Sequence, residues 1–186
     1  MNLRATGELA WPSDKVGRAP DHTSAEWGLW IGRPLLGQWT WDIRRLLDAI
    51  AEVDGKLPRK VAVVGFGPGG VVALAAAALD ERITRVAAFD TLSSYVTDTP
   101  YEGQRLGIIV PAILKNFGDV PDLAALIAPR RVLIAGGVRG NGQELQTPEL
   151  RDNYIRAQNA YALSSASGRF QVAQSRPGAL AAFLAE

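Results

Sequence analysis

The chain has 186 residues, which is enough for one domain with a substantial core and too few for two ordinary domains. Its 20 basic and 19 acidic side chains give a net charge of +1 without long runs of like charge, which argues against a nucleic-acid or membrane partner. The absence of cysteine and the presence of one histidine exclude disulfides, zinc–thiolate sites, iron–sulfur clusters and a histidine-based metal cluster. We therefore expect neither a metal site nor a cofactor.

The first part of the chain, residues 1–41, contains all five tryptophans among several prolines and glycines and shows little regular period. We expect an irregular segment whose large rings pack against a sheet. His22 in this segment is interpreted as a solvated loop residue. No apolar run has the length of a signal-peptide core or a membrane span, so the sequence predicts a soluble protein and leaves its compartment undetermined.

Residues 42–186 show alternating helix and strand patterns. An amphipathic helix is predicted over 42–52, with Ile43, Leu46, Leu47 and Ile50 on its inward face. Short apolar runs predict four strands, at Val61–Val64, Val86–Phe89, Val132–Ala135 and Phe170–Ala173, each followed by a helical segment. Continuous apolar runs are typical of strands covered on both faces, so we expect one α/β domain over 1–186, a three-layer sandwich with a mostly parallel sheet.

Two helix starts are visible later in the chain. Thr147 is predicted to cap a helix whose buried stripe contains Leu150, Tyr154, Ala157 and Tyr161. Asp119 is predicted to begin another helix. As an alternative, the carboxylates of Asp90, Asp98 and Asp119 could supply an acid–base pair.

The first predicted strand ends in a glycine turn, Gly65-Phe66-Gly67-Pro68-Gly69-Gly70, which begins an alanine-rich helix. The spacing fits a dinucleotide-binding turn, with Gly65, Phe66, Gly67, Pro68 and Gly69 near a pyrophosphate and Asp90 near a ribose. It also fits a nucleophile elbow, G-x-S-x-G, with Gly67 in the place of the serine.

Several stretches are similar to the α/β-hydrolase superfamily, particularly its bacterial acetyl-xylan-esterase-like members. They span nearly the whole chain and lie at residues 27–45, 61–70, 80–86, 110–117 and 122–134, the last including Ala128-Pro-Arg-Arg. This resemblance implies a partial α/β-hydrolase core. It also favours the elbow interpretation of the glycine turn over the dinucleotide one.

The resemblance implies that all three catalytic positions are substituted. The serine nucleophile would stand at Gly67, the acid at or next to Arg139, and the histidine near Ser175. Arg139 could instead bind an anion or remain solvated. Ser93 and Ser94 are the remaining candidate nucleophiles, although neither has a histidine to activate it.

Residues 3–8 resemble the turn after the family's fourth strand, which implies that three strands and one oxyanion-hole amide are absent. The first predicted strand would then have an open edge. We expect that edge to be covered by a homodimer, through strand pairing or exchange of residues 1–41, or by the rest of a longer hydrolase polypeptide.

Three functions stay open at this point. The first is a degenerate hydrolase with a binding or assembly role. The second is an active carboxylic-ester hydrolase of unconventional mechanism. The third is a nucleotide- or flavin-binding module on the glycine turn, which we expect not to bind a dinucleotide because Phe66 and Pro68 crowd it.

Overall fold

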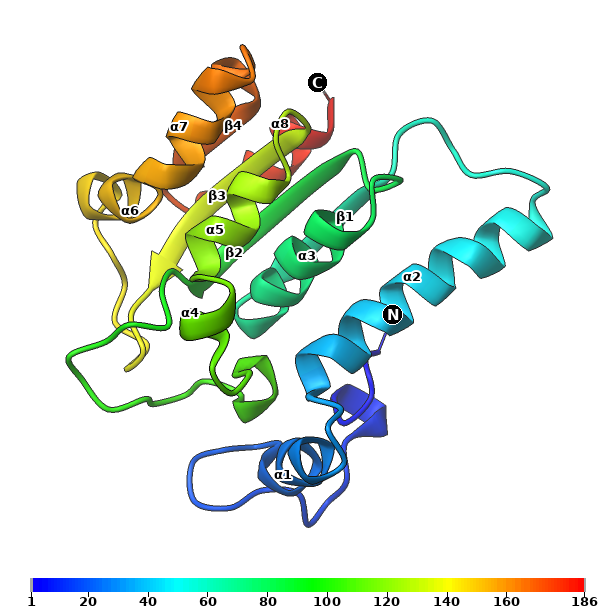
Figure 1. Cartoon of the computed structure of the whole chain (residues 1–186), viewed down its shortest axis with the longest axis vertical. Helices are drawn as coiled ribbons and strands as arrows, with labels where there is room; N and C mark the ends of the chain where they lie inside the picture. The colour runs from blue at the N-terminus through cyan, green and yellow to red at the C-terminus, as the bar shows by residue number, and fades with distance from the viewer. Residues whose placement is uncertain (1, 186) are drawn as a thin grey trace.

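The computed structural model describes residues 2–185 and shows an α/β fold built on one parallel sheet (Figure 1). The four strands lie side by side in chain order and pair in parallel. They are β1 (Ala62–Phe66), β2 (Arg85–Leu92), β3 (Arg131–Val138) and β4 (Phe170–Ala173). Each predicted strand overlaps one of them, so all four are confirmed.

Helices occupy the connections between the strands and both ends of the chain. They are α1 (His22–Trp30), α2 (Leu35–Val53), α3 (Pro68–Leu79), α4 (Ile113–Asn116), α5 (Val120–Leu126), α6 (Thr147–Asn153), α7 (Ile155–Leu163) and α8 (Ala179–Ala185). Short 3-10 turns lie at Gly7–Leu9, Leu106–Ile108 and Ser167–Arg169. None of the helices in residues 2–185 is long and apolar enough to cross a bilayer.

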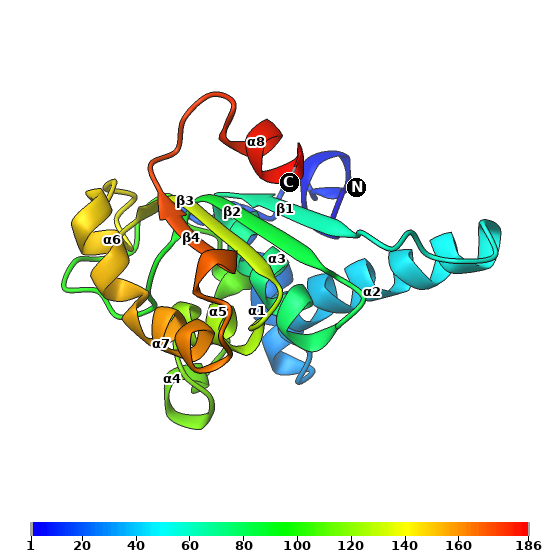
Figure 2. The same ribbon diagram turned by 90° about the horizontal axis from the view of Figure 1, so that it is seen from above.

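The sheet is covered on both faces, as predicted (Figure 2). Helices α3, α5 and α7 lie against one face, and α8 lies against the other. Along β2, Val86 and Ala88 belong to the larger core, whereas Ala87 and Phe89 pack toward Phe183 of α8. Both directions of the pleat are apolar, which explains the continuous apolar runs in the sequence.

The α8 face is held by a buried arginine at the start of β2. Arg85 is 6% exposed, and its Nη1 donates to the carbonyl oxygens of Phe183 at 3.3 Å and Leu184 at 3.0 Å. These carbonyls end α8 and lack partners within the helix, so the guanidinium satisfies them. Arg85 is charged, so it does not belong to the apolar run that predicts this strand. The predicted strand therefore begins one residue late, at Val86.

Residues 1–41 are not uniformly irregular, contrary to the prediction. They contain α1 and the first two turns of α2, which begins at Leu35 after Pro34 rather than at Asp42. Only Trp39 is buried among the tryptophans, and its Nε1 donates to the Arg4 carbonyl at 2.7 Å. The aromatic residues obscured the helical period because most of these rings face solvent.

Two smaller helix predictions also need correction. His22 begins α1 and is half-buried, with Nδ1 3.9 Å from Glu26 Oε2, so it is not a solvated loop residue. Thr147 is the first helical residue and makes no capping bond, since the cap position is Gln146. The predicted helix divides at Tyr154 into α6 and α7, although its four predicted stripe residues are all buried.

An arginine–carboxylate cluster joins α2, α3 and the start of β3. Arg82 Nη2 donates to Asp80 Oδ2 at 2.6 Å, and Arg44 Nε of α2 donates to the same oxygen at 3.3 Å. Arg130 Nη1 donates to the carbonyls of Asp80 at 3.0 Å and Ile83 at 2.8 Å. The hydrogen bonds from Arg82 lower the pKa of Asp80 to about 2.

Candidate functional site

The turn between β1 and α3 has the geometry of an elbow. Gly67 stands alone between the strand and the helix with φ 51° and ψ −127°, a backbone conformation that favours glycine. Its N–H donates to Phe89 O at 2.8 Å, and Thr91 Oγ1 donates to Gly67 O at 2.7 Å. A Cβ atom placed on Gly67 would meet nothing within 4 Å. These hydrogen bonds hold the backbone of residue 67 against β2, and a side chain at this position would point into open space.

The flanking glycines are explained by close packing. A Cβ on Gly65 would lie 2.0 Å from the Gly69 carbonyl oxygen, and one on Gly70 would lie 2.6 Å from Thr91 Cβ. Only glycine lets the helix approach the strands this closely. The glycine pattern thus follows from helix–strand contact and needs no nucleotide.

Three of the four positions from Gly67 to Gly70 cannot offer a free amide to a pyrophosphate at this helix N-terminus. Pro68 has no N–H. The amide of Gly67 is bonded to Phe89 O, and that of Gly70 donates to Gly67 O at 3.0 Å. These bonds favour the elbow interpretation over the dinucleotide one.

Pro68 has a second consequence that sequence reasoning missed. In a nucleophile elbow, the backbone N–H of the residue after the nucleophile stabilises the oxyanion. That residue is Pro68 here, so the donor is absent. The signal was present in the sequence, as a proline directly after the substituted nucleophile position.

Asp90 lies near the carboxyl end of β2, and its backbone conformation is unfavourable for a residue other than glycine. It has φ 49° and lies opposite Gly136, which has φ 72°, where the β2–β3 register passes from Phe89↔Ala135 to Thr91↔Gly137. A Cβ on Gly136 would lie 2.3 Å from Asp90 Oδ1, so glycine makes room for the carboxylate. The strand continues to Leu92, so the predicted end at Phe89 is three residues too early. A left-handed backbone conformation costs free energy in a residue other than glycine, and such residues are often found at functional sites.

Ser175 lies beside that carboxylate. Its Oγ donates to Asp90 Oδ2 at 3.0 Å. Arg139 instead forms an ion pair with Glu149 of α6, and its N–H donates to Gln143 O at 2.8 Å. The structure therefore brings Ser175 together with Asp90 of β2, and it places the Arg139 side chain on α6.

The two candidate nucleophiles differ in exposure, since Ser93 is buried and Ser94 is half-buried. Ser93 is 2% exposed, and its Oγ accepts from Asn153 Nδ2 at 3.1 Å. Ser94 Oγ donates to Asp119, which also accepts from the amides of Tyr95 and Val120, each at 2.7 Å. Asp119 caps α5, as predicted.

The predicted ligand residues fall into different hollows. Asp90 lines a polar hollow of about 380 Å³ at the carboxyl ends of the strands, together with Gly136, Glu144, Gln146, Thr147 and Ser175. Gly65, Phe66 and Gly69 line an apolar groove of about 450 Å³ beside β1. Asp119 lines a third hollow with Ser94, so it is not brought together with Asp90. Within residues 2–185, no three potential ligands gather to hold a metal ion.

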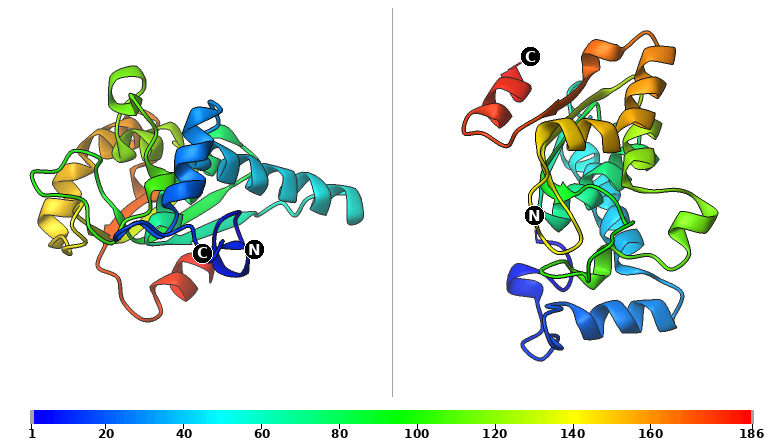
Figure 3. Two further views of the ribbon diagram at one scale, coloured as in Figure 1. Left: turned by 90° about the horizontal axis from the view of Figure 1, so that it is seen from below. Right: turned by 90° about the vertical axis from the view of Figure 1, so that its left-hand side faces the viewer.

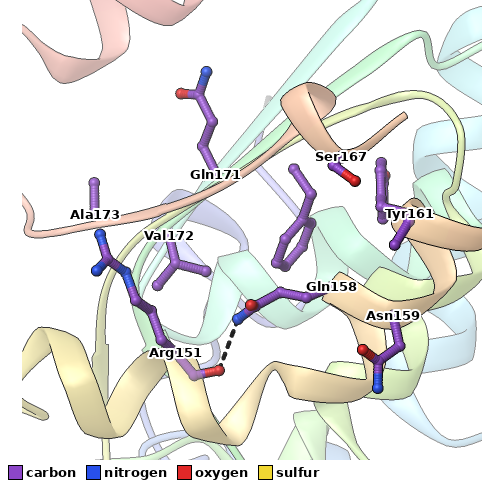
Figure 4. A pocket seen from close by; sticks show the side chains of 10 residues that line it. Arg151, Gln158, Asn159, Tyr161, Ser167, Gln171, Val172 and Ala173 are labelled. Atoms are coloured by element: carbon purple, nitrogen blue, oxygen red, sulfur yellow. Dashed lines mark hydrogen bonds between the residues drawn. The ribbon is translucent and has the colours of Figure 1, made fainter. Parts of the chain in front are cut away.

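A further hollow of about 660 Å³ lies between β4 and α7 (Figure 4). Polar side chains line it, and Gln158 Nε2 donates to the Arg151 carbonyl at 2.8 Å. None of its lining residues belongs to the elbow. Its size alone does not make it the site of the elbow's chemistry.

No protein-family model matches the chain, and no curated protein sequence matches it. Solved structures do. A candidate acetyl xylan esterase from Bacteroides fragilis aligns with a TM-score of 0.69 and 17% identity over 94% of this chain and 47% of its own. A glucuronoyl esterase from Caldicellulosiruptor kristjansonii aligns with a TM-score of 0.59 and 21% identity over 94% of this chain and 50% of its own. A glucuronoyl esterase from Solibacter usitatus aligns with a TM-score of 0.57 and 15% identity over 89% of this chain and 47% of its own.

This chain has the α/β fold of these esterases. The expected resemblance is thereby confirmed at the level of the fold. The chain spans about half the length of the structures it matches.

Proposed function

We propose that this esterase-like protein does not hydrolyse esters through a serine–histidine–acid triad and that it acts by binding. One observation carries the proposal. The elbow keeps the backbone geometry of a nucleophile turn, but it presents Gly67 followed by Pro68, so both the nucleophile and the adjacent oxyanion donor are absent.

The base position supports the same conclusion. A triad needs an imidazole that takes the serine proton and a carboxylate that orients that imidazole. Here the Asp90 carboxylate accepts a hydrogen bond from the Ser175 hydroxyl, whose oxygen is too weak a base to take a proton from a nucleophile. This pair therefore lacks the imidazole that a triad needs.

The polar hollow at Asp90 suggests the class of ligand. Its lining combines carboxylate acceptors, Asp90 and Glu144, with the hydroxyls of Thr147 and Ser175. Such groups suit a hydroxyl-rich molecule, and the matched structures include enzymes described as acetyl xylan and glucuronoyl esterases. We propose a carbohydrate ligand that is bound and released unchanged.

Binding can be tested by titrating xylo-oligosaccharides into the protein and following the ligand's NMR signals. Asp90→Asn should weaken binding, whereas Asp98→Asn, an exposed carboxylate outside the hollow, should not. Equal binding by the two variants would contradict the assignment of this hollow.

A second candidate function rests on a different contact. Ser94 donates to Asp119 and lines a hollow of about 490 Å³, so a serine–carboxylate pair is open to a ligand there. Asp119 also accepts hydrogen bonds from two backbone amides, which hold its carboxylate in place beside the Ser94 hydroxyl. Turnover of p-nitrophenyl acetate that disappears in Ser94→Ala would establish this second function.

A further inference from the structure

A groove of about 610 Å³ opens at the first turns of α2, away from the elbow. The N-terminal turn and α1 both lie beside this end of the helix (Figures 1 and 3). The groove shares no lining residue with the polar hollow at Asp90 or with the apolar groove beside β1. It is therefore separate from the site of the proposed carbohydrate ligand.

An aromatic ring forms one wall of this groove. Trp41 lines it, and its side chain is 52% exposed. The guanidinium carbons of Arg45 and Arg44 lie 4.9 Å and 5.9 Å from the ring centroid. Both arginines follow Trp41 in the helix, whereas Gly37 comes one turn before it and lines the same groove. The ring therefore presents an aromatic surface to the groove.

Gly37 keeps the space beside this ring empty. It lies in the first turn of α2, and a Cβ atom there would meet nothing within 4 Å. Close packing therefore does not explain this glycine, in contrast to Gly65 and Gly70 of the elbow. A larger side chain at residue 37 would project into the groove.

Arg33 gives the groove an unpaired positive charge. Its N–H donates to Gly28 O at 2.7 Å, and its carbonyl accepts from Gln38 Nε2 at 2.6 Å, so its backbone is held in place. Its guanidinium has no ion pair or hydrogen bond with any residue in the range 2–185. A guanidinium with free donors binds a carboxylate through two parallel N–H···O bonds.

The other polar side chains of the groove are already engaged. Gln38 donates to the Arg33 carbonyl, and its Oε1 accepts from Arg4 Nη1 at 2.9 Å. Arg4 Nε donates to Asp42 Oδ2 at 2.7 Å. Apart from Trp41, the remaining lining residues have no polar side chain; they are Gly32, Pro34 and Gly37. A sugar would gain few hydrogen bonds here, whereas a flat molecule with one anionic group would find a partner for each of its parts.

We propose that this groove binds a small aromatic carboxylate. Its ring stacks on Trp41 in the space left by Gly37, and its carboxylate pairs with Arg33. The stacking supplies the apolar contact, and the ion pair fixes the orientation of the ligand. The proposal does not rest on the carbohydrate site, because the two sites share no residue.

The test follows the indole N–H signal of Trp41 by NMR while p-anisate is titrated into the natural sequence. The signal is identified by its loss in Trp41→Phe. We expect a saturable shift with a dissociation constant in the millimolar range, which suits a ligand of this size. Two analogues should each bind about threefold or more weakly. The alcohol p-anisyl alcohol keeps the ring without the charge, and cyclohexanecarboxylate keeps the charge without the aromatic ring.

Two variants locate the site. Gly37→Leu fills the groove and should abolish the shift, and it should not lower the midpoint of thermal unfolding, because leucine is a better helix former than glycine. Arg33→Gln should weaken binding about threefold or more. Arg59→Gln is the matched control, since Arg59 is exposed and lies outside the groove, and it should leave binding unchanged.

Several results would overturn the proposal. They are a Trp41 signal that p-anisate does not move, equal affinity for p-anisate and p-anisyl alcohol, binding that survives Gly37→Leu, and equal binding by Arg33→Gln and Arg59→Gln. Xylo-oligosaccharides should leave the Trp41 signal unchanged whether or not they bind at Asp90. Failure of the carbohydrate site and failure of this groove are thus distinguishable.

Discussion

The Ser175 hydroxyl donates a hydrogen bond to Asp90 Oδ2 at 3.0 Å, across the carboxyl ends of β4 and β2. The residue at the expected histidine position is thus already in contact with a carboxylate. The Asp90 backbone has φ 49°, and Gly136 makes the room for its side chain. The geometry that would orient an imidazole is present, although the imidazole is not.

We expect that Gly67→Ser alone will not create an esterase. The new hydroxyl would face open space, but no base could take its proton, and Pro68 would still lack the oxyanion N–H. Turnover of p-nitrophenyl acetate should remain within about tenfold of the buffer background. Turnover of Gly67→Ser far above this level would show that a base exists elsewhere.

A combined variant should do more. Gly67→Ser with Pro68→Ala and Ser175→His supplies nucleophile, oxyanion amide and imidazole next to Asp90. We expect turnover at least about 100-fold above that of Gly67→Ser, because an oxyanion donor or a general base each contributes roughly this much. Adding Asp90→Asn should remove most of the gain, and adding Asp98→Asn should not. If the Asp90→Asn addition has no effect, Asp90 does not orient the new histidine.

Dinucleotides should not stabilise the protein. The amides of Gly67 and Gly70 are already bonded, and Pro68 has none to offer. The midpoint of thermal unfolding should therefore stay constant in millimolar NAD or FAD, since only a ligand of the folded state raises it. A rise of several degrees would return Asp90 to the role of ribose acceptor.

Replacing a glycine of the elbow with alanine should lower the free energy of unfolding, whereas the same replacement at an unconstrained glycine should not. Gly65→Ala places a Cβ 2.0 Å from a backbone oxygen, so we expect a loss of at least about 3 kcal/mol in the free energy of unfolding. Gly37 lies inside α2 with open space around its Cβ position. Gly37→Ala should therefore gain about 0.5–1 kcal/mol. Urea unfolding of both variants checks the contrast, and equal effects would argue against the close helix–strand contact.

The Asp80 cluster predicts a dependence of stability on acid. The folded pKa is lowered from 3.8 to about 2, so this group's contribution of about 2 kcal/mol is present above pH 4 and is lost as the pH falls toward 2. The difference in unfolding free energy between the natural sequence and Asp80→Asn should shrink over this interval. A difference that stays constant from pH 7 to pH 2 would rule out the shifted pKa.

The sequence predicted the sheet because its strands are continuous apolar runs, and it predicted Asp119 as a cap because the residue pattern is local. The stretches resembling the hydrolases are explained in part by scaffold contacts. Arg130 of the Ala-Pro-Arg-Arg stretch holds the Asp80 turn, and Gly65 and Gly70 permit the close approach of α3. These contacts depend on the fold alone, so they do not bear on catalysis.

The pairing of Asp90 with Ser175 could not be predicted, because the residues are distant in sequence and meet only through the order of the strands. The predicted inward face of α2 is only partly covered. Leu47 is buried and Ile43 packs against the core, whereas Leu46 is 40% exposed, because periodicity shows that a face is apolar without showing how much of it is covered.

The most direct test of the central claim is the hydrolysis of p-nitrophenyl acetate by the natural sequence, measured beside Ser93→Ala and Ser94→Ala. The absence of a nucleophile at Gly67 and of a base at Ser175 predicts that all three proteins turn over at the rate of the buffer. Turnover by the natural sequence that disappears in either alanine variant would contradict it and establish a serine hydrolase without a histidine.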